Sequence, residues 1–448
     1  MNADVSSMKT YAFVLLAVVS SAFARVDIYP GPEGISPSAK YAVTIIQDGK
    51  RYSSFVYLSK SKFHLDKRGA TTSWTTFSFS DPVTVEVTKL DGEVKSCVTR
   101  PSRFGIKAKI RDNTAIFTLE KPRKISIEFN DDITHSMLLF ADVLEADPPK
   151  STDENVMYFA PGRHTIGIGK RIPANTTVYL AGGAYVYGSL NVDGDNVTIR
   201  GRGVLSGDKW RKYKEFKNPK SGRMHDFKMI HGRNTNCRVE GITIVDFPAF
   251  AIIRCKLIEN VKTIGWYYNC DGVDVPENGL VKDCFLKVND DALKIYWDNS
   301  RAEDIIIWQY MNGAPFQWGW HGMSSDNVAV KNCDVIHVEY QGDANNRAVF
   351  NAARKRGGRR SNYLFENIYI EEPNLWRLFK LNLSGGAEIS NNVFRNLHVA
   401  GQLRHRNQIS GNGSVDFVFE NMTLDGKPVT DAGTAGFSEK DVHVAIFK

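Results

Sequence analysis

The sequence has little that would mark a metal-binding, redox or nucleic-acid-binding protein. Its six cysteines include no Cys-x-x-Cys pair, which argues against zinc-binding and thioredoxin-type chemistry. Lys and Arg number 57 and Asp and Glu 50 among 448 residues, so the net charge is only +7. No nucleic-acid-binding motif accompanies this small excess. We therefore expect no cofactor, no metal and no nucleic-acid partner.

The sequence also has few long apolar runs. After residue 24, no stretch reaches the roughly 18 apolar residues that a membrane-spanning helix needs. The first residues carry Lys9, an apolar run from Tyr11 to Val19 and the small-x-small pattern Ala22-Phe23-Ala24, which is typical of a secretory signal peptide cut after Ala24. We expect residues 1–24 to be removed. The mature protein is then a secreted, extracellular monomer without membrane attachment.

Two residue types fit an extracellular protein. Asn-x-Ser/Thr sequons are glycosylation acceptors when they are exposed, and they lie at Asn175, Asn196, Asn382, Asn412 and Asn421. Disulfide bonds are expected in this compartment, and the cysteines are Cys97, Cys237, Cys255, Cys270, Cys284 and Cys333. Six cysteines allow many pairings, and buried free thiols explain several of them equally well.

Residues 25–148 have the pattern of short strands. Apolar and polar residues alternate in segments such as 41–45, 83–87 and 124–129, and this period of two is typical of strands with one buried face. The segment 146–150 contains two adjacent prolines, which is typical of a linker. We predict an antiparallel β-sandwich domain over residues 25–148.

The rest of the chain repeats one short pattern. An apolar residue, a polar residue, a turn residue and an apolar-x-apolar triplet recur, as in Val281–Leu286 and Phe365–Ile370. The turn residues are at 241, 265, 283, 307, 332, 367, 396 and 421. A period of about 20 to 30 residues without a helical pattern predicts a solenoid of β-coils, and the Leu spacing and helices of leucine-rich repeats are missing. We predict an all-β chain in which a parallel β-helix over residues 149–448 follows the sandwich. Its corner Asn residues should take left-handed geometry and hydrogen-bond to the next coil.

Two neighbouring coils carry the densest acidic cluster. Asn269-Cys270-Asp271-Gly272-Val273-Asp274 precedes Asn289-Asp290-Asp291-Ala292-Leu293-Lys294. Asp271 and Asp290 are separated by about one coil, so we expect them to be stacked neighbours. Asp290 and Asp291 would point to opposite faces of a regular strand. A corner or bulge at Asn289 is therefore needed to bring both into one groove.

Such a cluster has a chemical use. Three adjacent carboxylates cannot all stay ionised, because like charges raise the pKa of at least one of them. The protonated acid can protonate a glycosidic oxygen while its ionised neighbours activate a water, which is inverting glycoside hydrolysis. Two other interpretations stay open: turn formation explains Asp274 as well as a functional role does, and clustered carboxylates also suit a calcium ion in a lyase.

Aromatic residues surround the acidic cluster. Trp266-Tyr267-Tyr268 leads into the first acidic segment, Tyr296-Trp297 follows the second, and residues 314–321 add a further aromatic group. Aromatic faces stack on sugar rings, and amide side chains bond sugar hydroxyls. We predict that the substrate is contacted by Asp274, Tyr296, Gln317, Trp318 and Trp320. A core position explains one of the two tryptophans equally well, and His321 is a weaker candidate contact.

Three of these segments, 269–272, 290–294 and 316–320, resemble the family 49 glycoside hydrolases, the dextranases and isopullulanases. This family shares a clan with the family 28 polygalacturonases. The order of signal peptide, sandwich and β-helix is also similar. The resemblance implies a right-handed β-helix and inverting, endo-acting hydrolysis of a polysaccharide without a metal.

Carried over residue by residue, the resemblance implies that Asp290 is the general acid and that Asp271 and Asp291 hold and deprotonate the water. It further implies that Lys294 contacts substrate and that Trp318 and Trp320 shape subsites. The substrate implied is an α-glucan such as dextran or pullulan.

The chain departs from the family in two ways: Cys270 stands where Thr is more usual, and the chain is shorter. Both point to a different loop set and substrate. The alternatives are a polygalacturonase-like hydrolase or lyase of an acidic polysaccharide, and a non-catalytic carbohydrate-binding β-helix. The Arg-x-Lys with which family 28 grips an acidic sugar is missing from its expected place.

Overall fold

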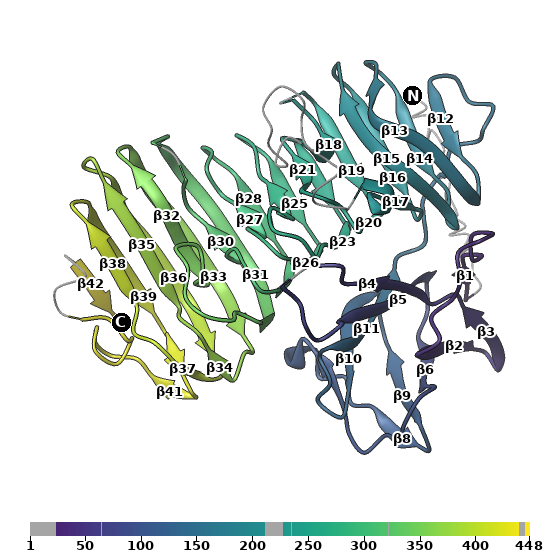
Figure 1. The fold of residues 1–448 in the computed structure, drawn as a ribbon, viewed down its shortest axis with the longest axis horizontal. Helices are drawn as coiled ribbons and strands as arrows, with labels where there is room; N and C mark the ends of the chain where they lie inside the picture. Colours follow the sequence, from purple (N-terminus) through teal and green to yellow (C-terminus); the bar gives the residue numbers. More distant parts are fainter. Residues whose placement is uncertain (1–23, 64, 211–226, 234, 321, 439–443) are drawn as a thin grey trace, which may run out of the picture.

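The protein is built of strands, as the sequence predicts. The structure, a computed structural model, describes residues 24–63, 65–210, 227–233, 235–320, 322–438 and 444–448 (Figure 1). Residues 1–23 of the predicted signal peptide, and His321, lie outside these ranges. Signal cleavage and secretion stay predictions. Within the described ranges, no helix has the length and apolar character needed to cross a bilayer.

The N-terminal part consists of two packed sheets. One contains β1 (Val26–Ile28), β4 (Tyr57–Lys60), β5 (Thr71–Phe79), β7 (Cys97–Arg100), β10 (Arg123–Phe129) and β11 (His135–Asp142). The other contains β2 (Tyr41–Gln47), β3 (Lys50–Ser54), β6 (Val83–Lys89), β8 (Lys109–Arg111) and β9 (Thr114–Leu119). A short 3-10 helix, η1 (Ser102–Phe104), follows β7. The sandwich is not purely antiparallel, because β5 and β11 pair in parallel.

The remaining strands stack into a β-helix with three faces (Figure 1). The first face contains β12 (Val156–Phe159), β14 (Thr177–Leu180), β16 (Val197–Gly201), β19 (Cys237–Glu240), β22 (Leu257–Glu259), β25 (Leu280–Lys282), β28 (Arg301–Glu303), β31 (Ser325–Val338), β33 (Arg359–Ile370), β36 (Glu388–Val399), β39 (Ser414–Glu420) and β42 (Val444–Phe447). The second begins with β13 (Gly162–Ile172), β15 (Ala184–Val192), β17 (Val204–Ser206), β20 (Thr243–Val245), β23 (Lys262–Ile264), β26 (Phe285–Val288) and β29 (Ile306–Gln309). It continues through the ends of β31, β33 and β36 to β40 (Thr423–Leu424).

The third face, called the site face below, continues from the end of β15. It contains β18 (Lys228–His231), β21 (Phe250–Ile253), β24 (Val273–Asp274), β27 (Leu293–Lys294), β30 (Phe316–Gln317), β32 (Phe350–Arg356), β35 (Phe379–Ser384) and β38 (Gln408–Gly411). Outside the three faces lie η2 (Asp208–Trp210), the pair β34 (Asn374–Leu375) and β37 (Gln402–Leu403), and β41 (Lys427–Pro428). The predicted fold class is confirmed. The boundary predicted at residue 148 falls between β11 and β12 and stays a prediction.

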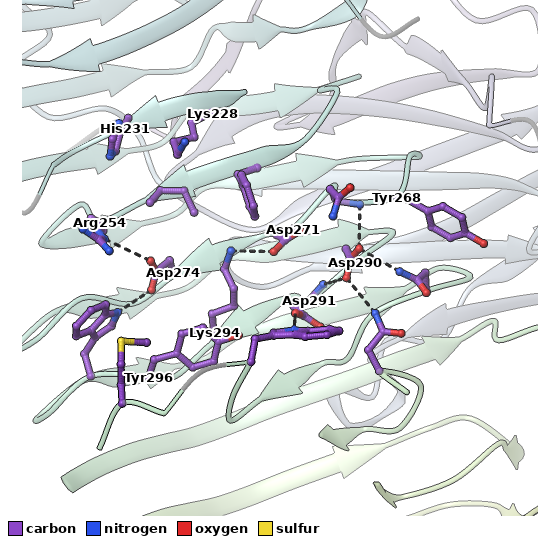
Figure 2. A pocket seen from close by; sticks show the side chains of 18 of the residues that line it. Lys228, His231, Arg254, Tyr268, Asp271, Asp274, Asp290, Asp291, Lys294 and Tyr296 are labelled. Atoms are coloured by element: carbon purple, nitrogen blue, oxygen red, sulfur yellow. Dashed lines mark hydrogen bonds and ion pairs between the residues drawn. The ribbon is translucent and has the colours of Figure 1, made fainter. Parts of the chain in front are cut away.

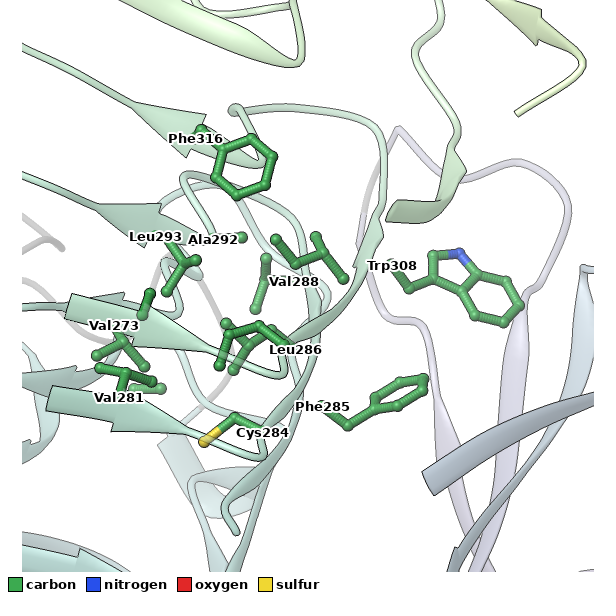
Figure 3. Packing of buried hydrophobic residues seen from close by; sticks show 14 of the residues in the cluster. Val273, Val281, Cys284, Phe285, Leu286, Val288, Ala292, Leu293, Trp308 and Phe316 are labelled. Carbon is green, nitrogen blue, oxygen red and sulfur yellow. The ribbon is translucent and has the colours of Figure 1, made fainter. Parts of the chain in front are cut away.

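The interior of the β-helix is a set of apolar columns. On the site face, Val273 pairs with Leu293 and Leu293 with Phe316, and all three are fully buried. Figure 3 shows these side chains packed together inside the coil. The next residue on each strand points to the other side of the sheet, because successive side chains alternate. The outward column therefore runs through Asp274, Lys294 and Gln317.

Asn side chains stack at the corner where the backbone passes from the first face to the second. Asn332, Asn367, Asn396 and Asn421 all have φ between 55° and 57°. Each of the last three amides donates to the carboxamide oxygen of the preceding Asn, with Asn367 Nδ2 2.9 Å from Asn332 Oδ1. Asn tolerates this left-handed geometry better than most residues. The prediction of stacked corner asparagines is therefore confirmed.

Two predicted corner positions are wrong. Gly265 follows β23 and Ile307 lies within β29, so neither is a corner. The corners of these coils are Asn260 and Asp304, with φ of 54° and 57°. The apolar-x-apolar triplets at 264–266 and 306–308 mimic the repeat, but they begin at the end of β23 and at the start of β29, beyond the corners.

The six-stranded sheet of the sandwich is buried on both sides. Phe77 and Ile127 face the core between the two sheets, whereas Trp74 and Phe140 pack against the β-helix. The ring centroids of Phe140 in the sandwich and Phe285 in the β-helix are 5.3 Å apart.

Charged and polar side chains are also buried at this boundary. Lys262 Nζ lies 2.7 Å from Asp142 Oδ2, and both side chains are fully shielded from solvent. Ser59 Oγ accepts from Trp266 Nε1 at 2.7 Å and donates to Asp246 Oδ1 at 2.5 Å. The sandwich therefore contacts the coils that precede the acidic cluster.

All six cysteines are free, so the expected disulfide bonds are absent. Five of them are buried in the β-helix, where they fill apolar space in stacked coils. The Sγ atoms of Cys237 and Cys255 are 3.2 Å apart, a hydrogen-bonding contact rather than a bond. The five sequon asparagines are exposed, and their glycosylation stays a prediction.

The corner ladder generates a stability prediction. Asn367→Ala loses two amide hydrogen bonds and leaves a non-glycine residue at φ 57°. Asn367→Gly loses the same bonds but tolerates the backbone geometry. We expect both variants to unfold more easily, and the alanine variant to be less stable by about 1 kcal/mol than the glycine variant. Urea unfolding measures this difference, and equal stabilities would contradict the left-handed corner.

Candidate active site

The two consecutive aspartates lie in the bend between β26 and β27, outside any regular strand. Asn289 fixes this bend, because its amide nitrogen donates to the Trp266 carbonyl at 2.5 Å and its amide oxygen accepts from Met311 N at 2.9 Å. It thus ties one coil to the coils on either side. The predicted irregularity at Asn289 is present, and it frees Asp290 and Asp291 from strict alternation.

The register places Asp271 opposite Asp291 rather than Asp290. Val273 pairs with Leu293, an offset of 20 residues, and Gly272 N donates to the Asp291 carbonyl at 2.9 Å. Asp271 and Asp290 are 19 residues apart in the sequence, which is one residue short of this coil. Because of the bend, all three carboxylates still reach the same surface.

Asp271, Asp290 and Asp291 line one open cavity of about 1100 Å³ above the site face (Figure 2). Asp274, Lys294, Tyr296 and Trp320 line it as well, as the sequence predicts. The structure thus gathers seven of the predicted site residues. In the described part of the chain, no group of three His, Cys, Asp or Glu side chains is arranged to hold a metal ion.

Asp290 is surrounded by N–H donors. Its Oδ2 accepts from Asn269 N at 2.9 Å and from Asn312 Nδ2 at 3.0 Å. Its Oδ1 accepts from Asp291 N at 3.0 Å and from Asn346 Nδ2 at 3.3 Å. The side chain therefore has a single defined orientation at the cavity wall.

Asp291 is held by a second set of donors. Gln317 Nε2 and Ala314 N donate to Oδ1 at 3.1 and 3.2 Å, and Trp320 Nε1 donates to Oδ2 at 2.8 Å. Hydrogen bonds to a carboxylate favour its ionised form. These three donors therefore oppose the effect of burial on this group.

Asp271 has one strong partner. Lys294 Nζ lies 2.8 Å from its Oδ2, and both side chains are buried. The other oxygen, Oδ1, is buried and has no hydrogen-bond partner. An unpaired carboxylate oxygen at a cavity wall is a natural site for a water molecule or a sugar hydroxyl.

The pKa values of all three carboxyls are raised, and burial is the main cause. Burial, opposed by Lys294, raises the pKa of Asp271 to about 7. Burial and the charges of Asp271 and Asp291 raise the pKa of Asp290 well above its ordinary value. The pKa of Asp291 is raised by burial against the hydrogen bonds from Gln317 and Trp320. The cluster therefore holds a proton near neutrality, and Asp290 is the group on which we place it.

Two predicted substrate contacts need correction. Trp318 is fully buried and does not line the cavity, because its ring packs in the apolar interior against Phe350 and Phe379. Gln317 is also fully buried, and it bonds Asp291 and Asn351. Gln317 thus positions a carboxylate, whereas Trp318 belongs to the core. Alternation explains the inward Trp318 next to the outward Gln317, whereas the chain has left the strand before Trp320, which reaches Asp291.

Several cavity residues were not predicted. Asn312 and Asn346 bond Asp290 from loops whose sequences look like ordinary turns. Lys228, His231 and Arg254 line the cavity from coils that precede the acidic motifs. No local motif marks them, although the coil period itself could have placed them on the same face.

The sequence of this chain is similar to those of polysaccharide-cleaving enzymes. The chain is 25% identical over 431 residues to an isopullulanase of Aspergillus niger. The aligned region covers 80% of this chain and 76% of the isopullulanase. The chain is also 25% identical over 398 residues to a dextranase of Arthrobacter sp. strain CB-8. That aligned region covers 69% of this chain and 62% of the dextranase. The resemblance to the family 49 glycoside hydrolases is confirmed.

The comparison of structures confirms the fold. The structure of Dex49A from Penicillium minioluteum matches with a TM-score of 0.73 at 19% sequence identity, over 94% of this chain and 96% of that chain. No protein-family model matches the sequence. The β-helix and its N-terminal sheets therefore resemble those of a solved family 49 structure.

The different positions of the two tryptophans give a stability prediction. Trp318→Ala leaves a large cavity in the aromatic interior, so we expect it to lower the free energy of unfolding by about 3–5 kcal/mol. Trp320→Ala removes a partly exposed ring at the cavity and should cost clearly less. Urea unfolding of both variants measures the difference. Equal losses would contradict the core position of Trp318.

Proposed function

We propose that the protein is a secreted inverting glycoside hydrolase that cleaves a polysaccharide in this cavity. The polysaccharide is an α-glucan such as dextran or pullulan. The relatives named isopullulanase and dextranase support the coarser assignment, a polysaccharide-cleaving glycoside hydrolase. One observation carries the proposal: three carboxyls from two successive coils line one open cavity, and their pKa values are raised.

Asp290 is the general acid in this proposal. Burial and the charges of Asp271 and Asp291 raise its pKa and favour the protonated carboxyl, and its orientation is fixed by surrounding amides. Once protonated, one of its oxygens must donate a hydrogen bond rather than accept one. Rotation of the Asn312 or Asn346 amide by half a turn supplies an acceptor in the free enzyme, and the glycosidic oxygen supplies it when substrate is bound.

Asp271 and Asp291 hold and deprotonate the attacking water. The unpaired Asp271 Oδ1 supplies an acceptor for a water proton, and the three N–H donors to Asp291 favour its ionised form. The water oxygen bonds to the anomeric carbon while the bond from that carbon to the glycosidic oxygen breaks. The Asp290 proton goes to the departing oxygen, and the water proton goes to the carboxylate. Attack from the face opposite the leaving group inverts the anomeric configuration.

Other cavity residues orient the sugar chain. Lys294 bonds Asp271 and lowers its pKa against the effect of burial. Trp320 and Tyr296 present aromatic surface to the cavity, and the Tyr296 hydroxyl is buried without a hydrogen-bond partner. Asp274 Oδ1 accepts from Trp297 Nε1 at 3.0 Å. These groups can stack on sugar rings and bond their hydroxyls.

Substitution of the acid tests the mechanism. Asp290→Asn cannot donate a carboxyl proton, so we expect turnover of dextran or pullulan to fall by about 10²–10⁴-fold. Reducing ends report the rate, and proton NMR of the first product reports its anomeric configuration. Asp416→Asn, a matched change on β39 away from the cavity, should keep full activity. Undiminished turnover in Asp290→Asn would remove Asp290 from the mechanism, and a retained configuration would exclude inversion.

The pH profile gives a second test. Activity requires ionised Asp271 and protonated Asp290, so the rate should rise through the lower pKa of the cluster and fall through the higher one. Lys294 lowers the pKa of Asp271, so its removal should move the acidic limb to higher pH.

We therefore expect kcat/KM of Lys294→Gln to rise with pH later than that of the wild type. Lys294→Arg retains the positive charge and should keep the acidic limb closer to its original position. An unmoved limb in Lys294→Gln would show that the Lys294–Asp271 pair does not control the profile.

A further inference from the structure

A buried chain of hydrogen bonds leads away from Asp291 along the outward column of the site face. Gln317 on β30 pairs with Asn351 on β32, and Asn351 pairs with Lys380 on β35. Gln317 and Asn351 are fully shielded from solvent, and Asn351 does not line the cavity. Gln317 Nε2 donates to Asp291 Oδ1 at 3.1 Å and to Asn351 Oδ1 at 2.9 Å. Asn351 therefore reaches the carboxyl cluster through Gln317.

Backbone carbonyls fix the far end of this chain. Asn351 Nδ2 donates to the carbonyl oxygens of Asn345 and Lys380, at 2.9 Å each. A carbonyl oxygen can only accept a hydrogen bond. The amide nitrogen of Asn351 must therefore face these two groups, and its amide oxygen must face Gln317. The orientation of this carboxamide follows from its surroundings, although its nitrogen and oxygen are alike in shape.

The Gln317 carboxamide is fixed in the same way. Its Oε1 accepts from Gly319 N at 3.0 Å, and the Asn351 oxygen is one of the two acceptors of its Nε2. Rotation by half a turn would place the amide nitrogen against the Gly319 N–H and the amide oxygen against Asn351 Oδ1. Two donors or two acceptors would then face each other. Gln317 therefore presents an N–H, rather than an oxygen, to Asp291.

The other partners of Asp291 are donors as well. Ala314 N is a backbone N–H and Trp320 Nε1 is an indole N–H, and neither can accept a hydrogen bond. These groups and the fixed Gln317 amide offer no acceptor to a protonated Asp291. The wall around Asp291 therefore favours the carboxylate.

The surroundings of Asp290 are less strictly fixed. Its side-chain partners Asn312 and Asn346 each make one side-chain hydrogen bond within the described ranges, the bond to Asp290. Either amide can rotate and accept from a protonated acid. The two consecutive aspartates thus differ in what their neighbours permit, since Asp290 can carry a proton whereas Asp291 faces donors of fixed orientation.

Burial and nearby charges act on Asp291 together with these bonds. Burial raises the pKa of Asp291, and the hydrogen bond from Gln317 is the strongest effect that opposes it, followed by Trp320 and the charge of Lys294. The other titratable groups that interact with Asp291 are Asp271, Asp290, Tyr296 and Tyr340. Within the described ranges, none of these four is hydrogen-bonded to the Gln317 or Asn351 side chain. Removal of Asn351 therefore loosens the Gln317 bond and leaves these charges in place.

We propose that Asn351 is a positioning residue that keeps the Gln317 carboxamide donating to Asp291 and thereby reserves Asp291 as the base of the hydrolysis. The inference rests on the proposed function, because it assigns a part in that reaction to a residue outside the cavity. Asn351 touches neither the substrate nor the reacting atoms. Its removal should therefore slow the reaction without weakening substrate binding.

Removal of Asn351 tests this role through kinetics. In Asn351→Ala, the Gln317 amide loses an acceptor and can move away from Asp291, so kcat on dextran or pullulan should fall by about tenfold, while KM stays within about twofold. The weakened bond should raise the pKa of Asp291, so the acidic limb of kcat/KM should move to higher pH. In a Gln317→Ala background, Asn351→Ala should not move this limb further. An unmoved limb, or equal shifts in both backgrounds, would overturn the proposal.

Two variants separate positioning from a purely structural role. Asn351→Ser retains a hydroxyl that can donate to a carbonyl, but it is too short to reach Gln317, so its limb should move as in Asn351→Ala even if the alanine variant folds poorly. Asn392 is also fully buried and donates to two carbonyls, those of Arg360 and Ser390, away from the cavity. Asn392→Ala should lower the melting temperature without moving the limb. A wild-type profile in Asn351→Ser, or a shifted limb in Asn392→Ala, would contradict positioning by Asn351.

Direct titration of Asp291 distinguishes failure of this inference from failure of the hydrolase. Carbon-13 labelling of the aspartate carboxyl groups makes them visible by NMR, and loss of one signal in Asp291→Asn assigns it. The Asp291 signal should titrate at higher pH in Asn351→Ala than in the wild type. If it does and no polymer yields reducing ends, control of Asp291 by Asn351 stands and the hydrolase is overturned. If the signal does not move while the wild type releases reducing ends, the hydrolase stands and the positioning role is overturned.

Discussion

The in-register stacking of parallel coils is the constraint on which the rest of the structure depends. Each strand of the site face pairs with its neighbours one coil before and after, so residues about 20 positions apart in sequence become neighbours in space. The inward column must be apolar at every level, as Val273, Leu293 and Phe316 are. The outward column is free to vary and carries Asp274, Lys294 and Gln317. Function is therefore distributed along the helix axis rather than within any one segment.

Packing of the coils buries three carboxyl groups at the site, and their burial has an electrostatic cost. A buried carboxyl is costly in its ionised form unless it is paired or hydrogen-bonded. The three aspartates have different surroundings: Asp271 pairs with Lys294, Asp291 accepts three N–H donors, and Asp290 accepts four, while burial and the charges of Asp271 and Asp291 raise its pKa. Environments that push neighbouring pKa values apart allow similar groups to take different roles. The Asn289 bend makes this possible, because it presents Asp290 and Asp291 to one cavity.

Much of the fold could be predicted because its signals are periodic. Alternation identified the sandwich strands, and the recurrent corner Asn identified the coils. The misplaced corners at 265 and 307 show the limit, since an apolar-x-apolar triplet does not reveal where along the coil the corner lies. The parallel β5–β11 pair could not be foreseen, because strand order within a sandwich depends on contacts between distant segments.

The site was predicted where residues cluster in sequence and missed where they cluster only in space. Asp271, Asp290 and Asp291 stand in dense acidic motifs, whereas Asn312, Asn346 and Arg254 are isolated residues that the coils bring to the cavity. Trp318 and Trp320 are two residues apart, and the turn between them, not their composition, sends one inward and the other to Asp291.

The buried pair of Asp142 and Lys262 joins the last strand of the sandwich to the second face of the β-helix. Surrounding charges lower the pKa of Asp142 despite burial, and burial lowers the pKa of Lys262 to about 8. Separation of the two modules within the folded state would leave each charge without its counterion beside an apolar surface. The buried pair therefore opposes separation of the sandwich from the β-helix.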